Sequence, residues 1–73
     1  MGDLGLTNDE WGAARRVCSA RQLVAMRLRD GGMSWREVAL SMDGQPSVTT
    51  VKDLVRRGII NSRREMAHAP DPE

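Results

Sequence analysis

Apolar and polar positions alternate with a helical period in the central part of the chain, and a short polar run divides this pattern into two segments. In the first segment, Val38, Ala39 and Met42 have the spacing that places side chains on one helix face. The sequence DGQP at 43–46 then brings in a glycine and a proline, which break helices. The pattern predicts two short helices joined by a tight polar turn.

Capping residues mark the ends of these two helices. Ser34 and Glu37 form a capping box, in which each side chain accepts a hydrogen bond from the backbone N–H of the other residue. Ser47 has the place of an N-cap for the second helix, and Gly58 has the place of a left-handed residue that ends it. An apolar stripe follows the second helix through Val48, Val51, Leu54 and Val55. These features predict a helix-turn-helix over residues 34–57.

Two more helices are predicted upstream, each opened by a capping box. The boxes are Thr7/Glu10 and Ser19/Gln22, and the helices cover about residues 9–18 and 20–30. The second of these helices is apolar on more than one side, so we expect it to lie centrally between its neighbours. With no Phe or Tyr in the chain, the predicted core consists of Leu23, Met26, Val38, Ala39, Met42, Val51 and Leu54.

Beyond Gly58 the pattern leaves alternatives open. Ile59 and Ile60 suit either a short β segment of a wing or the base of the core, and Ser62 is spaced to cap a fifth helix over residues 63–67. The predicted fold is therefore all-α, a small bundle of four to five helices with a short wing or C-terminal helix after Gly58. Its parts are a flexible N-terminus (1–6), a helical helix-turn-helix domain (7–61), and a short helix with a disordered acidic tail (62–73).

The segment ARQLVAMRLRDGGMSWREVALSM, continued by SVTTVKDLVRRG, resembles the helix-turn-helix of bacterial sigma-factor region 4 and of related response-regulator and resolvase-type domains. The shared pattern is an apolar-plus-Arg helix, a Gly-Met-Ser turn, an Arg-Glu-Val-Ala helix and a Ser-x-x-Thr-Val-Lys start of the reading helix. Here the turn after the Arg-Glu-Val-Ala helix is about two residues longer than in the family. The resemblance implies an all-helical DNA-binding domain in which Trp35 and Arg36 contact the phosphate backbone; packing against the reading helix is the alternative for Trp35.

The charges are unevenly distributed along the chain. The net charge is +1, but residues 15–64 hold all eleven Lys and Arg residues with four acidic residues, a surplus of seven positive charges. Residues 1–14 and 65–73 each carry three acidic residues. A basic middle with acidic ends is expected of a surface that meets phosphate. The alternative is that these arginines only solvate helix faces.

Polar side chains fill the faces of the second helix that the apolar stripe leaves free. Near the helix start, short side chains suit base edges, whereas longer basic side chains reach guanine or phosphate. The candidate DNA-binding residues are Trp35, Arg36, Gln45, Ser47, Thr49, Thr50, Lys52, Asp53, Arg56, Arg57, Arg63 and Arg64. We expect sequence-dependent binding of double-stranded DNA by a transcriptional regulator (a repressor, sigma-like or excision-type factor) of the kind common in phages. A domain this small suggests a homodimer or a larger complex.

A second class of function remains open, namely a protein-binding adaptor or inhibitor. Sigma region 4 itself docks on RNA polymerase, so a bacterial host protein of that kind is the alternative partner. The low net charge, the acidic ends and the longer turn favour this alternative.

Enzymatic chemistry finds little support in the sequence. Cys18 and His68 are the single cysteine and histidine, which leaves no metal-ligand cluster and no nucleophile–histidine set. The glycine-rich pieces lack the lysine of a phosphate loop. We therefore expect no enzyme activity, no cofactor or metal, and no small-molecule substrate. With no long apolar run, we expect no membrane association and a location in the bacterial cytoplasm or nucleoid.

Overall fold

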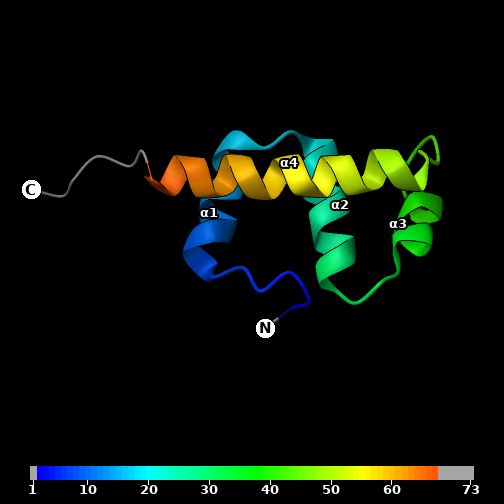
Figure 1. The fold of residues 1–73 in the computed structure, drawn as a ribbon, viewed down its shortest axis with the longest axis horizontal. Helices are drawn as coiled ribbons and strands as arrows, with labels where there is room; N and C mark the ends of the chain where they lie inside the picture. The colour runs from blue at the N-terminus through cyan, green and yellow to red at the C-terminus, as the bar shows by residue number, and fades with distance from the viewer. Residues whose placement is uncertain (1, 68–73) are drawn as a thin grey trace, which may run out of the picture.

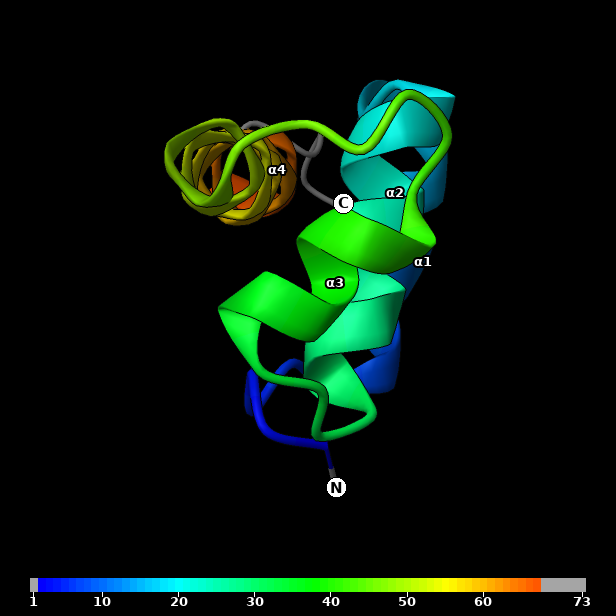
Figure 2. The ribbon, with the colours of Figure 1, turned by 90° about the vertical axis from the view of Figure 1, so that its right-hand side faces the viewer.

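The structure, a computed structural model, describes residues 2–67, which contain four α-helices. They are α1 (Asn8–Val17), α2 (Ala20–Asp30), α3 (Trp35–Ser41) and α4 (Val48–Ala67). The long helix α4 spans the bundle, with α1 near one end and α3 near the other (Figure 1). Viewed along its axis, α4 lies beside the shorter helices (Figure 2). It contacts all three of them, so α4 is the central helix, a position that the sequence pattern assigned to α2.

All three predicted capping boxes are confirmed. In each, the hydroxyl of the N-cap residue accepts from a backbone N–H three residues later, and the side chain at that position accepts from the N-cap N–H. The pairs are Thr7/Glu10, Ser19/Gln22 and Ser34/Glu37. The predicted cap of α4 is also present, since Ser47 Oγ accepts from the N–H of Thr50 at 3.1 Å. Local sequence signals therefore set where every helix begins.

Two of these boxes should make the stability depend on pH. Hydrogen bonds from the N-cap N–H of Thr7 and of Ser34 hold the pKa values of Glu10 and Glu37 below the ordinary value of 4.5. A lowered pKa in the folded state gives stabilisation that is present above the ordinary pKa and is lost as the pH falls through the lowered pKa. Urea unfolding measured at a series of acidic pH values should therefore show a falling midpoint below about pH 4.5. Glu37→Gln keeps the acceptor without the charge, so this variant should show a weaker fall; an unchanged pH profile would contradict the assignment.

The buried core contains most of the predicted residues. Met26, Val38, Ala39, Met42 and Val51 are buried, as predicted. Two other predicted core residues, Leu23 and Leu54, are only partly buried and pack against the edge of this core. The core is completed by Leu6, Ala14, Ala25 and Val55.

The first residues of the chain pack against the bundle, which differs from the predicted flexible N-terminus. The side chain of Leu6 is only 5% exposed. The N–H of Asp3 donates to the carbonyl of Asp30 at 3.0 Å, and the N–H of Leu4 donates to the Asp30 carboxylate at the same distance. Residues 2–6 are thus attached to the end of α2 and cover part of the core.

The prediction that the second helix ends at Gly58 is wrong, and with it the wing and the separate fifth helix. α4 continues without a break to Ala67, so residues 59–67 belong to it. Gly58 is buried, and a Cβ atom at this position would meet the side chains of Met26 and Cys18. Ser62 is also buried, and its hydroxyl donates to the carbonyl of Gly58 at 2.7 Å instead of capping a helix. The glycine therefore permits close packing of α4 on α2. The predicted acidic tail, residues 68–73, lies outside the described residues.

Candidate nucleic-acid interface

The first half of α4 presents a polar face to solvent on the side opposite the core. Val51 and Val55 are buried and define the inner side of the helix. Because an α-helix turns by about 100° per residue, Thr49 and Asp53 lie on the opposite side. Both are exposed, and the Asp53 side chain is 51% accessible. We call Thr49 and Asp53 the outer line of α4.

Basic side chains lie on both flanks of this outer line. By the same helical geometry, Lys52 and Arg56 lie on the flank that faces Trp35, and Arg57 lies with Thr50 on the other flank. All four are exposed. Arg57 Nε donates to Asp53 Oδ2 at 3.0 Å, whereas Lys52 and Arg56 form no ion pair within residues 2–67. The predicted residues from Thr49 to Arg57 therefore share one exposed surface.

Trp35, at the start of α3, links this surface to α2. Its ring is partly buried against the core, so the packing role is present. The Arg29 guanidinium lies 4.7 Å from the ring centroid and the Lys52 ammonium 6.0 Å from it, both within reach of cation–π attraction. Arg29 also donates to the carbonyl of Met33 at 2.7 Å. Arg29 is not among the predicted site residues. It approaches Trp35 only because the segment between α2 and α3 turns the chain back.

An open groove runs between Trp35 and the Lys52 flank of α4. Its lining includes the apolar side chains of Leu4 and Ile59, the basic side chains of Lys52 and Arg56, and the carboxylate-bearing Asp53. Leu4 belongs to the N-terminal segment, which the sequence pattern did not connect with any site. The groove gives this flank an apolar floor under basic side chains.

The segment between α3 and α4 has an unusual backbone. Gly44 and Gln45 both have positive φ angles, 78° and 43°. Only Gln45 is a non-glycine residue with such an angle among those described, and its side chain is exposed. Ser47 uses its hydroxyl within the helix cap, where it also bonds the hydroxyl of Thr50 at 3.0 Å. The exposed Gln45 side chain is therefore accessible to a binding partner, whereas the hydroxyl groups of Ser47 and Thr50 hydrogen-bond with each other.

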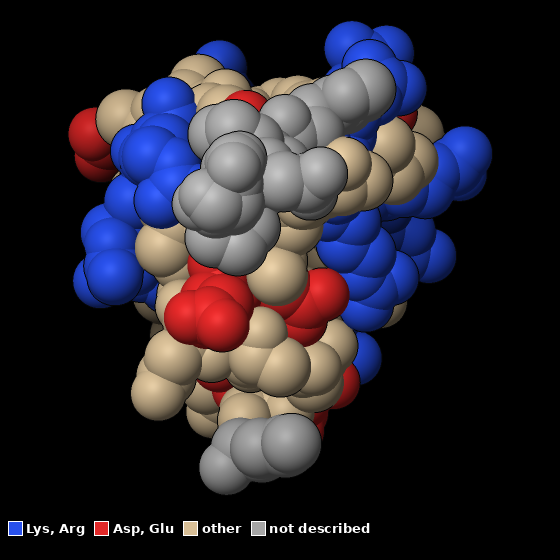
Figure 3. Space-filling model, turned by 90° about the vertical axis from the view of Figure 1, so that its left-hand side faces the viewer, with Lys and Arg blue, Asp and Glu red and all other residues tan. Residues whose placement is uncertain are grey.

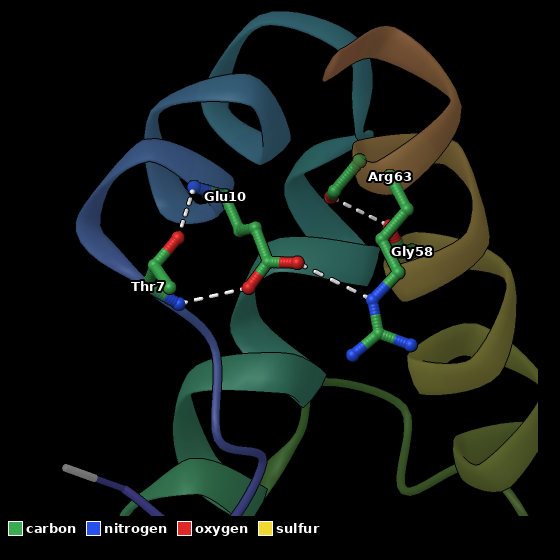
Figure 4. Close-up of polar contacts among 5 residues, drawn as sticks. Thr7, Glu10, Gly58 and Arg63 are labelled. Atoms are coloured by element: carbon green, nitrogen blue, oxygen red, sulfur yellow. Dashed lines mark hydrogen bonds and ion pairs between the residues drawn. The ribbon is translucent and has the colours of Figure 1, made fainter. Parts of the chain in front are cut away.

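Arg36 and the two late arginines occupy different surroundings. Arg36 is exposed next to Trp35. Arg63 donates to the Glu10 carboxylate at 3.3 Å, and the same carboxylate accepts from the N–H of Thr7, as Figure 4 shows. Arg63 lies about 15 Å along α4 from Asp53, so it belongs to the α1 contact and not to the surface around the outer line. Arg64 is exposed in the same distant turn.

The end of the molecule where α4 finishes combines both signs of charge. Figure 3 shows Lys and Arg side chains on two sides of this end, with Asp and Glu side chains between them. Arg16 pairs with Glu65 at 3.4 Å, which adds a second ion pair between α1 and α4. The second half of α4 thus attaches to α1, while Lys52 and Arg56 in the first half form no ion pair within the described residues.

Other kinds of site find no support among the described residues. Within residues 2–67, no three His, Cys, Asp or Glu side chains gather in a way that could hold a metal ion. In the same range, no helix combines the length and the apolar character that crossing a membrane requires. Comparisons of the chain with protein families, curated proteins and solved structures gave no match.

Proposed function

We propose that this protein binds double-stranded DNA in a sequence-dependent manner, with α3, the following turn and α4 acting as a helix-turn-helix. The observation that carries the proposal is the exposed face of the first half of α4, where Lys52, Arg56 and Arg57 flank the short side chains of Thr49 and Asp53. The major groove of DNA is about 12 Å wide and admits one α-helix. Short side chains at the centre suit base edges, and basic side chains on both flanks suit the phosphates on either side.

The neighbouring residues are consistent with this docking. Trp35 lies at the start of α3 beside the Lys52 flank, and the exposed Arg36 follows it in the same helix; both suit contacts to a phosphate backbone. The exposed Gln45 in the turn is available to an adenine edge. A single domain of this size buries little DNA surface, so the regulator acts as a homodimer or within a larger complex. Its role is that of a transcriptional regulator.

Chemical-shift mapping by NMR tests the proposal directly. When a duplex of random sequence is added at low salt to isotope-labelled protein, the amide signals of Gln45 and of residues 47–57 should shift, together with the indole signal of Trp35. The amides of α1 should stay in place, because α1 lies at the other end of the bundle. Shifts confined to α1 and the end of α4, or no shifts at all, would contradict the proposal.

The groove beside Trp35 favours a second candidate, an adaptor or inhibitor that binds a bacterial protein such as RNA polymerase. An apolar floor with Lys52 and Arg56 beside it suits a partner segment that combines aliphatic and acidic side chains. This candidate predicts that Leu4 and Ile59 take part in binding, which DNA docking does not require. If purified RNA polymerase shifts the signals of these two residues while DNA shifts none, the adaptor function replaces the regulator function.

A further inference from the structure

Asp53 places a negative charge in the middle of the basic face of α4. Lys52, Arg56 and Arg57 surround it, and it stands on the outer line opposite the buried Val51. A carboxylate at this position opposes the approach of any phosphate and so lowers the affinity for DNA in general. Its one described partner is the Arg57 guanidinium at 3.0 Å, and both side chains are at least half exposed. An exposed ion pair of this kind adds little stability, so the pair is free to exchange partners.

We propose that Asp53 is a specificity-determining residue that reads cytosine in the major groove; this rests on the proposed DNA binding. Cytosine presents an amino group there, which a carboxylate accepts. Guanine presents two acceptors and thymine presents an acceptor and a methyl group, so both repel or fail to bond a carboxylate. Adenine presents an amino group beside an acceptor nitrogen, and the acceptor repels the second carboxylate oxygen.

Arg57 completes the exchange. In the free protein its guanidinium pairs with Asp53, which reduces but does not remove the repulsion between the carboxylate and the incoming duplex. Arg57 lies on the flank of α4, so in the proposed complex it points toward the wall of the DNA major groove and not toward the base edges. Its partner there is a phosphate. When Arg57 moves to that phosphate, Asp53 is left with the cytosine amino group. Phosphate binding by Arg57 thus leaves the Asp53 carboxylate available for base readout.

The test is selection of binding sites from a random duplex library with three proteins: the wild type and the variants Asp53→Asn and Asp53→Ala. The wild type should enrich a site with a C·G pair that contributes about tenfold or more in affinity. Asp53→Asn should change the preference at that pair from cytosine to adenine, because an amide both accepts and donates and so suits adenine. Asp53→Ala should lose the preference at that pair alone. Both variants should bind random duplex more tightly than the wild type, since each removes a negative charge.

Arg57→Ala is the matched control on the same ion pair. It should weaken binding to all sequences alike and leave the enriched site unchanged. An ion pair with only a structural role would not predict this uniform loss of affinity. If the wild type enriches a site that neither Asp53 variant changes, the role of Asp53 is wrong and DNA binding stands. If the wild type enriches no sequence, both the readout by Asp53 and the sequence-dependent function are overturned.

Discussion

Replacing Gly58 with valine should destabilise the protein by about 2–3 kcal/mol, the largest loss that we expect from one substitution. A Cβ atom at Gly58 would overlap Met26 Sδ and lie 3.3 Å from Met26 Cγ. Met26 is itself fully buried, so its side chain has no open space to move into. A domain of this size has a total stability of only about 5 kcal/mol, so the loss is a large part of the total. Urea unfolding followed by circular dichroism measures it.

Gly12→Val is the matched control, because Gly12 is also inside a helix. A Cβ atom there would meet only Arg16 Nη1, at 3.9 Å, beyond the helix's own backbone. Valine and glycine differ little in helix propensity, so this variant should unfold within about 0.5 kcal/mol of the parent. If Gly58→Val matches the parent as well, α4 does not pack on Met26 through Gly58.

The same glycine explains which part of the fold the sequence could predict. The start of a helix depends on residues within one turn of it in the sequence, and the capping boxes therefore allowed the helix starts to be predicted. A glycine suits both a helix end and a close helix contact, and only the residue that packs against it decides between them. At Gly58 that residue is Met26 on another helix, which no local pattern reveals. The packing of the N-terminal segment was unpredictable for the same reason. Leu6 is buried by contacts with residues that are distant in sequence, so the local pattern indicated a flexible N-terminus.

The triple variant Lys52/Arg56/Arg57→Ala should lose roughly 100-fold in affinity for duplex DNA at low salt, with little change in stability. In the proposed complex each substitution removes one contact to phosphate or base. The three side chains are exposed, so the core is unaffected. Fluorescence anisotropy with a labelled duplex measures the affinity, and urea unfolding checks the fold. Full affinity in a folded triple variant would show that α4 does not carry the DNA contacts.

Arg15/Arg21/Arg27→Ala is the matched control for the triple variant. It also removes three positive charges, but from exposed positions on α1 and α2. None of these three arginines forms an ion pair within residues 2–67. This control should lose far less affinity, because only general attraction changes. Equal losses in the two variants would mean that net charge, and not the face of α4, determines binding.

The candidate surface was predictable where it depended on helical period alone. The apolar stripe of α4 fixed which of the residues Thr49 to Arg57 face solvent, and the structure places them there. Arg63 was predicted to belong to the same surface from its charge and its nearness in sequence, the only information that the sequence offered. Its actual partner, Glu10, is brought near by the packing of α1 on α4, a contact between distant segments.

The salt dependence of binding to random duplex DNA tests the central claim most directly. If Arg36, Lys52, Arg56 and Arg57 each neutralise one phosphate, the logarithm of the binding constant should fall against the logarithm of salt concentration with a slope between about −3 and −4. The triple variant should reduce this slope to about −1. A wild-type protein that binds with a slope near zero, or that binds no DNA even at low salt, would contradict the account.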